Sequence, residues 1–249
     1  MHAFTYLILA ILVYATAGAP SPYIIGGDKV TIGKLPYQVS LRLNNSHICG
    51  GSIIDSLNIL TAAYCVVGLQ CSLDKLKVHV GTNFLNVSGF VYDVSSITVH
   101  QNYDDYLLIN DIALIHLKNP IRFNKLVKSI NLPSYVGDPE DQYCTLSGWG
   151  ATGFHSPSNM SNNLQEITGK VYSQKKCAEE HWHLMDSHIC ILLSKYNAET
   201  CYGDYGGPLV LNGTQIGIIS FKSPCGGDNP NIYTRVRSFT SWIYTNLER

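Results

Sequence analysis

Short runs of alternating side chains set the pattern of this chain. Between residues 37 and 43, polar residues separate the apolar residues Tyr37, Val39, Leu41 and Leu43. This period of two predicts a half-buried strand. Brief runs rich in β-branched or aromatic residues recur at residues 78–80, 91–94, 112–117, 209–211 and 216–221, separated by Gly, Asn, Pro and Ser. Many short strands predict an all-β chain, which closed or nearly closed barrels satisfy best.

The end of the chain has a helical spacing instead. Four apolar residues fall on one helical face, namely Phe239, Trp242, Ile243 and Leu247. Ser238 or Thr240 is the candidate cap for this helix. The pattern therefore predicts a C-terminal helix that packs on the strands.

The start of the chain predicts secretion. An uncharged apolar run from Phe4 to Tyr14 is followed by the small residues Ala15, Thr16 and Ala17, as in a signal peptide of residues 1–17. Cleavage after Ala19 also fits, and an N-terminal membrane anchor is the alternative. Residues 18–23 then form a short propeptide, and the mature protein is extracellular.

Composition limits the partners. The 249 residues are 45% hydrophobic and 14% charged, which suits one or two compact domains. Because 17 basic residues nearly balance 18 acidic ones, no overall field favours nucleic acid or an anionic membrane. Neither is a predicted partner.

Eight cysteines in a secreted chain predict disulfides rather than metal or redox chemistry. Asn-x-Ser/Thr motifs make four asparagines candidates for glycosylation, although an unmodified loop is the alternative at each: Asn44, Asn86, Asn159 and Asn212.

Five segments resemble, in order, the motifs of the chymotrypsin/trypsin-like (S1) serine proteases. They are Ile24-Ile25-Gly26-Gly27, Thr61-Ala62-Ala63-Tyr64-Cys65, Asp111-Ile112-Ala113-Leu114, Ser147-Gly148-Trp149-Gly150 and Gly203-Asp204-Tyr205-Gly206-Gly207-Pro208. The resemblance covers residues 24–249 and implies two antiparallel six-stranded β-barrels with a C-terminal helix. Barrel one spans about residues 24–130 and barrel two about 131–249, with the stretch from Asn124 to Pro133 as the connector.

The same resemblance implies three disulfides: Cys49–Cys65, Cys177–Cys190 and Cys201–Cys225. Cys71 and Cys144 are left over, because Leu211 stands where many relatives have the partner of Cys144. Two interpretations remain open for them: two buried free thiols, or an intermolecular bridge through Cys71.

The resemblance also places the catalytic triad, of which only Asp111 is retained. Hydrolysis requires a hydroxyl that an imidazole activates, and a carboxylate that orients the imidazole. Tyr64 stands in place of the histidine, and a phenol with a pKa of about 10 is a poor base at neutral pH. Tyr205 stands in place of the serine, where its ring should extend past the oxyanion-hole position Gly203 and fill the cleft. We therefore expect a pseudoprotease.

Other histidines offer weak alternatives. His47, His100 or His188 could replace the missing base, but the resemblance places them at structural positions. His181 and His183 with His188 could suggest zinc, but no ligand pattern accompanies them. The sequence predicts no metal and no cofactor.

The predicted substrate pocket is degenerate as well. Its positions by resemblance are Glu199, Ser220, Lys222 and Asn231. Lys222 and Asn231 replace glycines whose lack of a side chain admits substrate in active relatives. Lys222 either pairs with Glu199 and closes the pocket or extends into solvent.

Activation is altered too. Tyr23 precedes Ile24, where tryptic activation requires Arg or Lys. By resemblance, the amine of Ile24 would pair with the carboxylate of Asp204 once the chain is cut. Whether the bond between Tyr23 and Ile24 is cut stays open.

With both catalytic residues replaced, the sequence resembles the inactivated protease paralogues of the scabies mite, which are relatives of the mite group 3 allergens. That resemblance implies a secreted, monomeric binding or decoy protein that interferes with host complement through exposed loops. The alternatives are an inactive cofactor in an immune protease cascade and a residual serine-type hydrolase.

Overall fold

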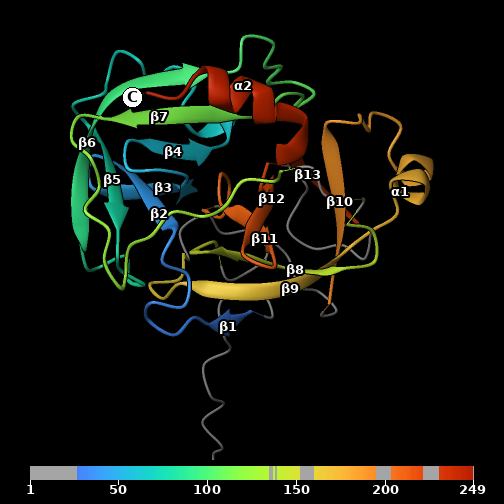
Figure 1. Ribbon diagram of the computed structural model, residues 1–249, viewed down its shortest axis with the longest axis horizontal. Coiled ribbons are helices and arrows are strands. Elements are labelled where there is room, and N and C mark those ends of the chain that lie inside the picture. The colour runs from blue at the N-terminus through green and yellow to red at the C-terminus, as the bar shows by residue number, and fades with distance from the viewer. Residues whose placement is uncertain are drawn as a thin grey trace, which may run out of the picture.

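The computed structural model describes residues 27–134, 137, 139–151, 160–194, 203–220 and 230–248. Two antiparallel β-barrels lie side by side (Figure 1), which confirms the all-β class and the predicted pair of six-stranded barrels. Residues 1–26 fall outside the described part, so the predicted signal peptide and propeptide stay predictions.

Barrel one closes through the neighbour order β2-β3-β4-β7-β6-β5. The bounds of these strands are β2 Gln38–Leu43, β3 Ser46–Ile53, β4 Asn58–Thr61, β5 Leu76–Val80, β6 Phe90–Val99 and β7 Ala113–Leu117. Apolar side chains of all six strands point inward and form a core that continues into barrel two.

The prediction of a half-buried strand at residues 37–43 was wrong in one respect, because β2 is buried on both faces. Its polar residues Gln38, Ser40 and Arg42 face other protein groups instead of water. The Ser147 hydroxyl of barrel two donates to Gln38 Oε1 at 2.7 Å, and Arg42 Nη2 donates to the Val87 carbonyl at 3.2 Å. Alternation therefore indicated the strand but not that its polar face is covered.

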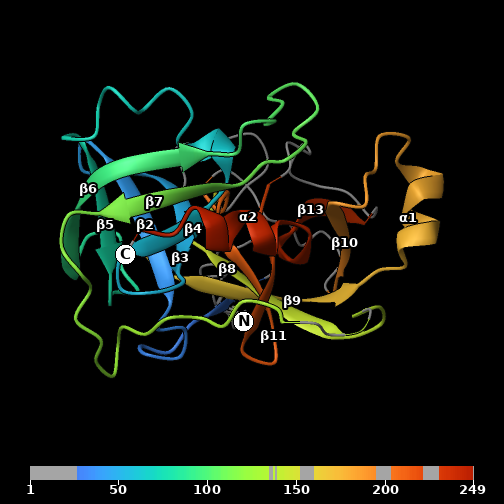
Figure 2. The ribbon, with the colours of Figure 1, turned by 45° about the horizontal axis from the view of Figure 1, so that its top comes forward.

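Barrel two closes through β8 Tyr143–Gly148, β9 Gln165–Val171, β10 His188–Leu193, β13 Asn231–Arg235, β12 Thr214–Ile218 and β11 Pro208–Leu211. A short strand, β1 Asp28–Lys29, adds to the edge of β9. Helix α1 Gln174–Glu180 joins β9 to β10 and lies at the outer end of this barrel (Figure 2).

The predicted C-terminal helix is present as α2 Thr240–Thr245, preceded by the 3-10 turn η2 Val236–Phe239. The predicted cap was wrong: Phe239 is the N-cap residue, and no side chain caps the helix. The chain enters α2 directly from the 3-10 turn, which takes the place of a separate capping residue.

Helix α2 follows barrel two in sequence but packs beside barrel one (Figure 2). Trp242 Nε1 donates to Gln101 Oε1 at 3.1 Å, and the Glu248 amide donates to Asn58 Oδ1 at 3.0 Å. The two barrels are therefore tied together by the end of the chain as well as by their shared core.

Disulfides join Cys49 to Cys65 and Cys177 to Cys190. The third expected pair, Cys201–Cys225, lies outside the described residues. Cys144 is buried, and burial raises the pKa of its thiol to about 12. Cys71 is exposed, so the interpretation of two buried thiols was wrong for this residue.

Three of the candidate glycosylation sites lie on the described surface. Asn44 and Asn212 are exposed in the turns between β2 and β3 and between β11 and β12, and Asn86 is exposed before β6. Asn159 falls outside the described residues. In the described part of the chain, no helix has the length and apolar character needed to span a membrane.

Candidate active site

The triad positions come together at the interface of the two barrels. Asp111 lies two residues before β7, and Tyr64 lies in the 3-10 turn η1 Ala63–Cys65 that follows β4. Both belong to barrel one, whereas Tyr205 lies in the turn before β11 of barrel two. The structure thus brings together three residues that are far apart in the sequence.

Asp111 is fully buried and accepts hydrogen bonds on both carboxylate oxygens. The Tyr64 amide donates to Oδ1 at 2.8 Å, and the Ser220 hydroxyl donates to Oδ2 at 2.6 Å. Burial raises the pKa of Asp111 to about 6, while these donors and the Ala63 amide act in the opposite direction. The carboxylate is therefore held by structural donors.

Ser220 makes a contact that the sequence did not indicate. Its hydroxyl donates to the Asp111 carboxylate of barrel one. It lies two residues after the end of β12 and is buried. Ser220 therefore supports the carboxylate, and its expected place at the substrate pocket stays a prediction.

The two tyrosines that the resemblance places at the catalytic positions, Tyr64 and Tyr205, touch each other. Tyr205 is 7% exposed and belongs to the hydrophobic core, whereas Tyr64 is 44% exposed. Their rings meet edge to face with centroids 5.7 Å apart and an interplanar angle of 78°. This geometry is a favourable aromatic contact, so the position that the resemblance assigns to the nucleophile carries a packed side chain.

The turn around Tyr205 is fixed by its backbone. The Gly50 amide of β3 donates to the Tyr205 carbonyl at 2.7 Å, and the Gly206 amide donates to Ile219 at 2.7 Å. Gly203 and Gly206 have φ values of 96° and 79°, which favour glycine. A Cβ on Gly206 would also overlap the Thr61 hydroxyl and the Gly50 carbonyl. Position 206 therefore requires glycine both for its backbone conformation and for lack of space.

Asp204 is buried beside the segment Ser147-Gly148-Trp149-Gly150. The Gly150 amide donates to its Oδ1 at 2.8 Å. A Cβ on Gly148 or Gly150 would overlap the Asp204 carboxylate. Both positions therefore require glycine because a side chain there would displace the Asp204 carboxylate, which the sequence motif alone did not show. The expected partner Ile24 lies outside the described residues.

His47 connects β3 to the oxyanion-hole position. Its Nδ1 lies 2.8 Å from the Ser40 hydroxyl and its Nε2 lies 2.8 Å from the Gly203 carbonyl. Burial lowers the pKa of His47 to about 4, and the ring packs edge-on against Trp149. Both ring nitrogens thus have structural partners within the protein.

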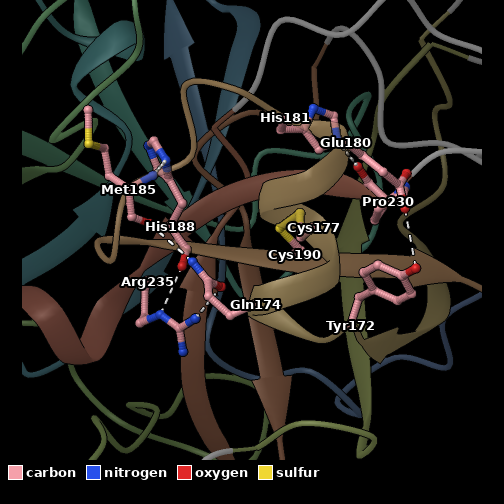
Figure 3. The surroundings of a disulfide bond; sticks show 10 residues. All are labelled: Tyr172, Gln174, Cys177, Glu180, His181, Met185, His188, Cys190, Pro230 and Arg235. Carbon is pink, nitrogen blue, oxygen red and sulfur yellow. Dashed lines mark hydrogen bonds between the residues drawn. A yellow bond between two sulfur atoms is a disulfide. The ribbon is translucent and has the colours of Figure 1, made fainter.

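The other histidines have similar surroundings. Burial lowers the pKa of His100 and of His188. His188 Nδ1 accepts from the Met185 amide at 3.1 Å, and His181 Nε2 lies 2.9 Å from the Pro230 carbonyl (Figure 3). No group of three His, Cys, Asp or Glu side chains among the described residues is arranged to hold a metal ion.

Of the predicted pocket residues, Asn231 is half-buried in β13 and pairs with Ile191 of β10. Glu199 and Lys222 lie outside the described residues, so their expected ion pair stays a prediction.

Tyr103 is a neighbour of the site that the sequence did not indicate. Its hydroxyl is buried and has no hydrogen-bond partner within the described structure. Burial raises the pKa of Tyr103, and the negative charge of Asp111 adds to the shift. The chain has 16 tyrosines, and only the fold singles out this one.

Comparison with known proteins gives a consistent result. The family model described as Trypsin matches residues 24–243. Chymotrypsin-2 of Vespa crabro is 44% identical over 227 residues, which cover 90% of this chain and 99% of the relative. Trypsin delta of Drosophila erecta is 35% identical over 228 residues, which cover 90% of this chain and 88% of the relative.

A solved structure is similar in fold and in sequence. Neuropsin, a serine protease expressed in the limbic system of mouse brain, superimposes with a TM-score of 0.80 at 30% identity. The match covers 90% of this chain and 99% of the neuropsin chain. This chain therefore belongs to the trypsin family of serine proteases and their homologues.

Proposed function

We propose that this protein does not hydrolyse peptide bonds and acts instead by binding other proteins. The observation that carries the proposal is the position of Tyr205, whose nearly buried ring packs against Tyr64 where the nucleophile and its base would stand. A phenol held in this way lies against a second phenol instead of an imidazole, and it cannot approach a substrate carbonyl as a serine hydroxyl does.

The remaining titratable groups support the same conclusion. Asp111 has a pKa near 6, but it is fully buried and both its oxygens accept structural hydrogen bonds. His47 is neutral at physiological pH and holds Ser40 and Gly203. A general base must lie within hydrogen-bond reach of the proton that it removes, and these contacts already occupy both groups.

A residual serine-type hydrolase is the second candidate. It is favoured by the relatives, which are named as chymotrypsin and trypsins, and by the retained Asp111 and the glycine-shaped turn at Gly203. The test is an amidase and esterase assay of the mature protein with basic, aromatic and aliphatic peptide substrates. We expect no turnover. Turnover that copurifies with the protein and disappears in Tyr205→Phe would establish the hydrolase.

Restoring the triad sharpens that test. Tyr64→His with Tyr205→Ser rebuilds a base and a nucleophile beside Asp111. If Lys222 and Asn231 obstruct the pocket, kcat/KM should stay several orders below the ~10⁴ M⁻¹s⁻¹ of slow ordinary enzymes. Adding Lys222→Gly and Asn231→Gly should then raise it, whereas efficient cleavage by the double variant would contradict the pocket hypothesis.

We further propose that the binding partners are host complement proteins and that the protein meets them as a secreted monomer. This proposal rests on the resemblance to inactivated mite paralogues, and a filled cleft directs the contact to surface loops. An interface of ordinary size buries about 800 Å² per partner and depends on a few central residues.

The corresponding experiment measures complement lysis of sensitised red cells. Wild type and Tyr205→Ala should inhibit equally, and a subset of charge reversals in exposed loops should lose inhibition. If Tyr205→Ala alone abolishes inhibition, the cleft is the binding site. If wild type never inhibits, complement is not the target, and a role in an immune protease cascade takes its place for testing.

A further inference from the structure

Barrel two contains a cavity of about 210 Å³ that no triad residue lines. The β11–β12 hairpin, β10, the end of β13 and the connector before β8 surround it. Residues that line it include Pro133, Ile189, Leu211, Ile216, Arg235 and Arg237. The cavity is a separate feature from the degenerate active site, so a ligand bound there would be independent of the proposed function.

The walls of the cavity are apolar and well supported. Ile189 is 1% exposed, and Leu211 and Ile216 pack against the same hydrophobic core. The connector is held to β12, because the Gln215 amide donates to the Asn131 carbonyl at 2.9 Å. A wall made of core side chains and a hydrogen-bonded connector keeps its shape without a ligand.

Two arginines, Arg235 and Arg237, are among the residues that line this apolar space. Arg235 Nε donates to the His188 carbonyl at 2.8 Å, and its Nη2 donates to Gln174 Oε1 at 2.7 Å (Figure 3). These bonds fix the direction of its guanidinium. Arg237 is exposed and lines the same cavity. Both arginines also line an adjoining polar hollow with Asp186, whose carboxylate disfavours an anion there.

We propose that this cavity binds a small apolar carboxylate, such as one ring on a short acid side chain. A cavity of about 150 Å³ accommodates benzene, so the available space holds a single ring with a few further atoms. Guanidinium groups form strong, charge-assisted bonds with carboxylates. The ring would contact Leu211 and Ile216, and the carboxylate would face Arg237 and Arg235.

The test uses phenylacetate as the probe and follows its binding by ligand-observed NMR and calorimetry. All proteins carry Asn212→Gln, because Asn212 lies at the rim and a glycan there would cover the cavity. Phenylacetate should bind saturably. Phenylethanol, which lacks the charge, and acetate, which lacks the ring, should each bind at least ~10-fold more weakly.

Variants assign the site. Arg237→Gln should weaken phenylacetate at least ~10-fold, and Leu211→Trp should abolish binding by filling the cavity. Arg122→Gln is the matched control, since Arg122 is an exposed arginine of barrel one. Equal binding by Arg237→Gln and wild type, equal binding of phenylethanol, or no saturable binding of phenylacetate would overturn the proposal. Because Arg237 is exposed, its variant should fold even if Leu211→Trp does not.

Discussion

The turn that carries Asp204 and the pair formed by Tyr64 and Tyr205 share one interface, yet different forces hold them. Backbone hydrogen bonds from Gly50 and Gly206 fix the turn, and glycines shape the space for its carboxylate. The tyrosine pair is held by ring packing. The turn is shaped by its glycines, whereas Tyr64 and Tyr205 stand where the resemblance to the family places the histidine and the serine.

This difference teaches that the framework of a catalytic site and its reactive groups are physically separable. The framework contributes to stability, because removing a donor or a glycine would leave a buried carboxylate unpaired or overlapped. The reactive groups make few such contributions. The turn can therefore be needed for stability whether or not the chain catalyses a reaction.

A substitution in the glycine framework around Asp204 should have the largest effect on stability. Gly150→Ala should lower the free energy of unfolding by about 3 kcal/mol, because its Cβ would overlap the Asp204 carboxylate and disturb the Gly150 amide bond. Urea unfolding followed by tryptophan fluorescence measures the change. Gly137→Ala is the control, since a Cβ there meets open space. Equal stability of the two variants would show that the carboxylate has room to move.

Removing one donor from Asp111 should have the next largest effect. Ser220→Ala leaves the buried carboxylate without its 2.6 Å hydroxyl partner and should cost about 2 kcal/mol at pH 7.5. The same urea experiment measures it, with the exposed Ser241→Ala for comparison. A loss no greater than that of Ser241→Ala would mean that the buried carboxylate does not need the Ser220 hydroxyl.

The sequence predicted the strands and the tail helix because each depends on local periodicity. It did not predict the buried polar face of β2, because Gln38 is covered by Ser147 from the other barrel. The cap at Phe239 was missed for a local reason, since a 3-10 turn continues directly into the helix.

The candidate site divides in the same way. Motif resemblance located Tyr64, Asp111 and Tyr205, since their order along the chain suffices for that. The contact of Ser220 with Asp111 and the buried hydroxyl of Tyr103 arise only when remote segments pack together. Contacts of that kind leave no periodic signal in the sequence.

The dependence of stability on pH should separate Asp111 from His47, with effects of at most about 3 kcal/mol each. The pKa of Asp111 in the folded protein is raised to about 6. Its contribution to the free energy of unfolding is therefore present below the unfolded value near 4 and lost as the pH rises through 6. The folded pKa of His47 is lowered to about 4, so its contribution is present above 6.5 and lost as the pH falls through 4.

Between pH 4 and 6.5 the two groups therefore act with opposite signs. Relative to Asp111→Asn, wild type should lose stability as the pH rises, and relative to His47→Gln it should gain stability. Denaturant titrations at several pH values measure both differences. Parallel curves for wild type and Asp111→Asn would mean that the carboxylate is solvated like an ordinary aspartate.

The smallest effect concerns the two free cysteines of the described residues, which lie in different barrels and differ in burial. Cys71 is exposed in barrel one and Cys144 is buried in barrel two with a pKa raised to about 12. Thiolate is the reactive form, so burial protects Cys144 twice, by limiting access and by suppressing ionisation.

Cys71→Ser should change the free energy of unfolding by less than about 0.5 kcal/mol. Maleimide should label Cys71 in the native protein and Cys144 only after denaturation, as mass spectrometry of tryptic peptides would show. If Cys71 resists labelling and wild type migrates as a dimer that Cys71→Ser abolishes, an intermolecular bridge is present and the protein is not a monomer.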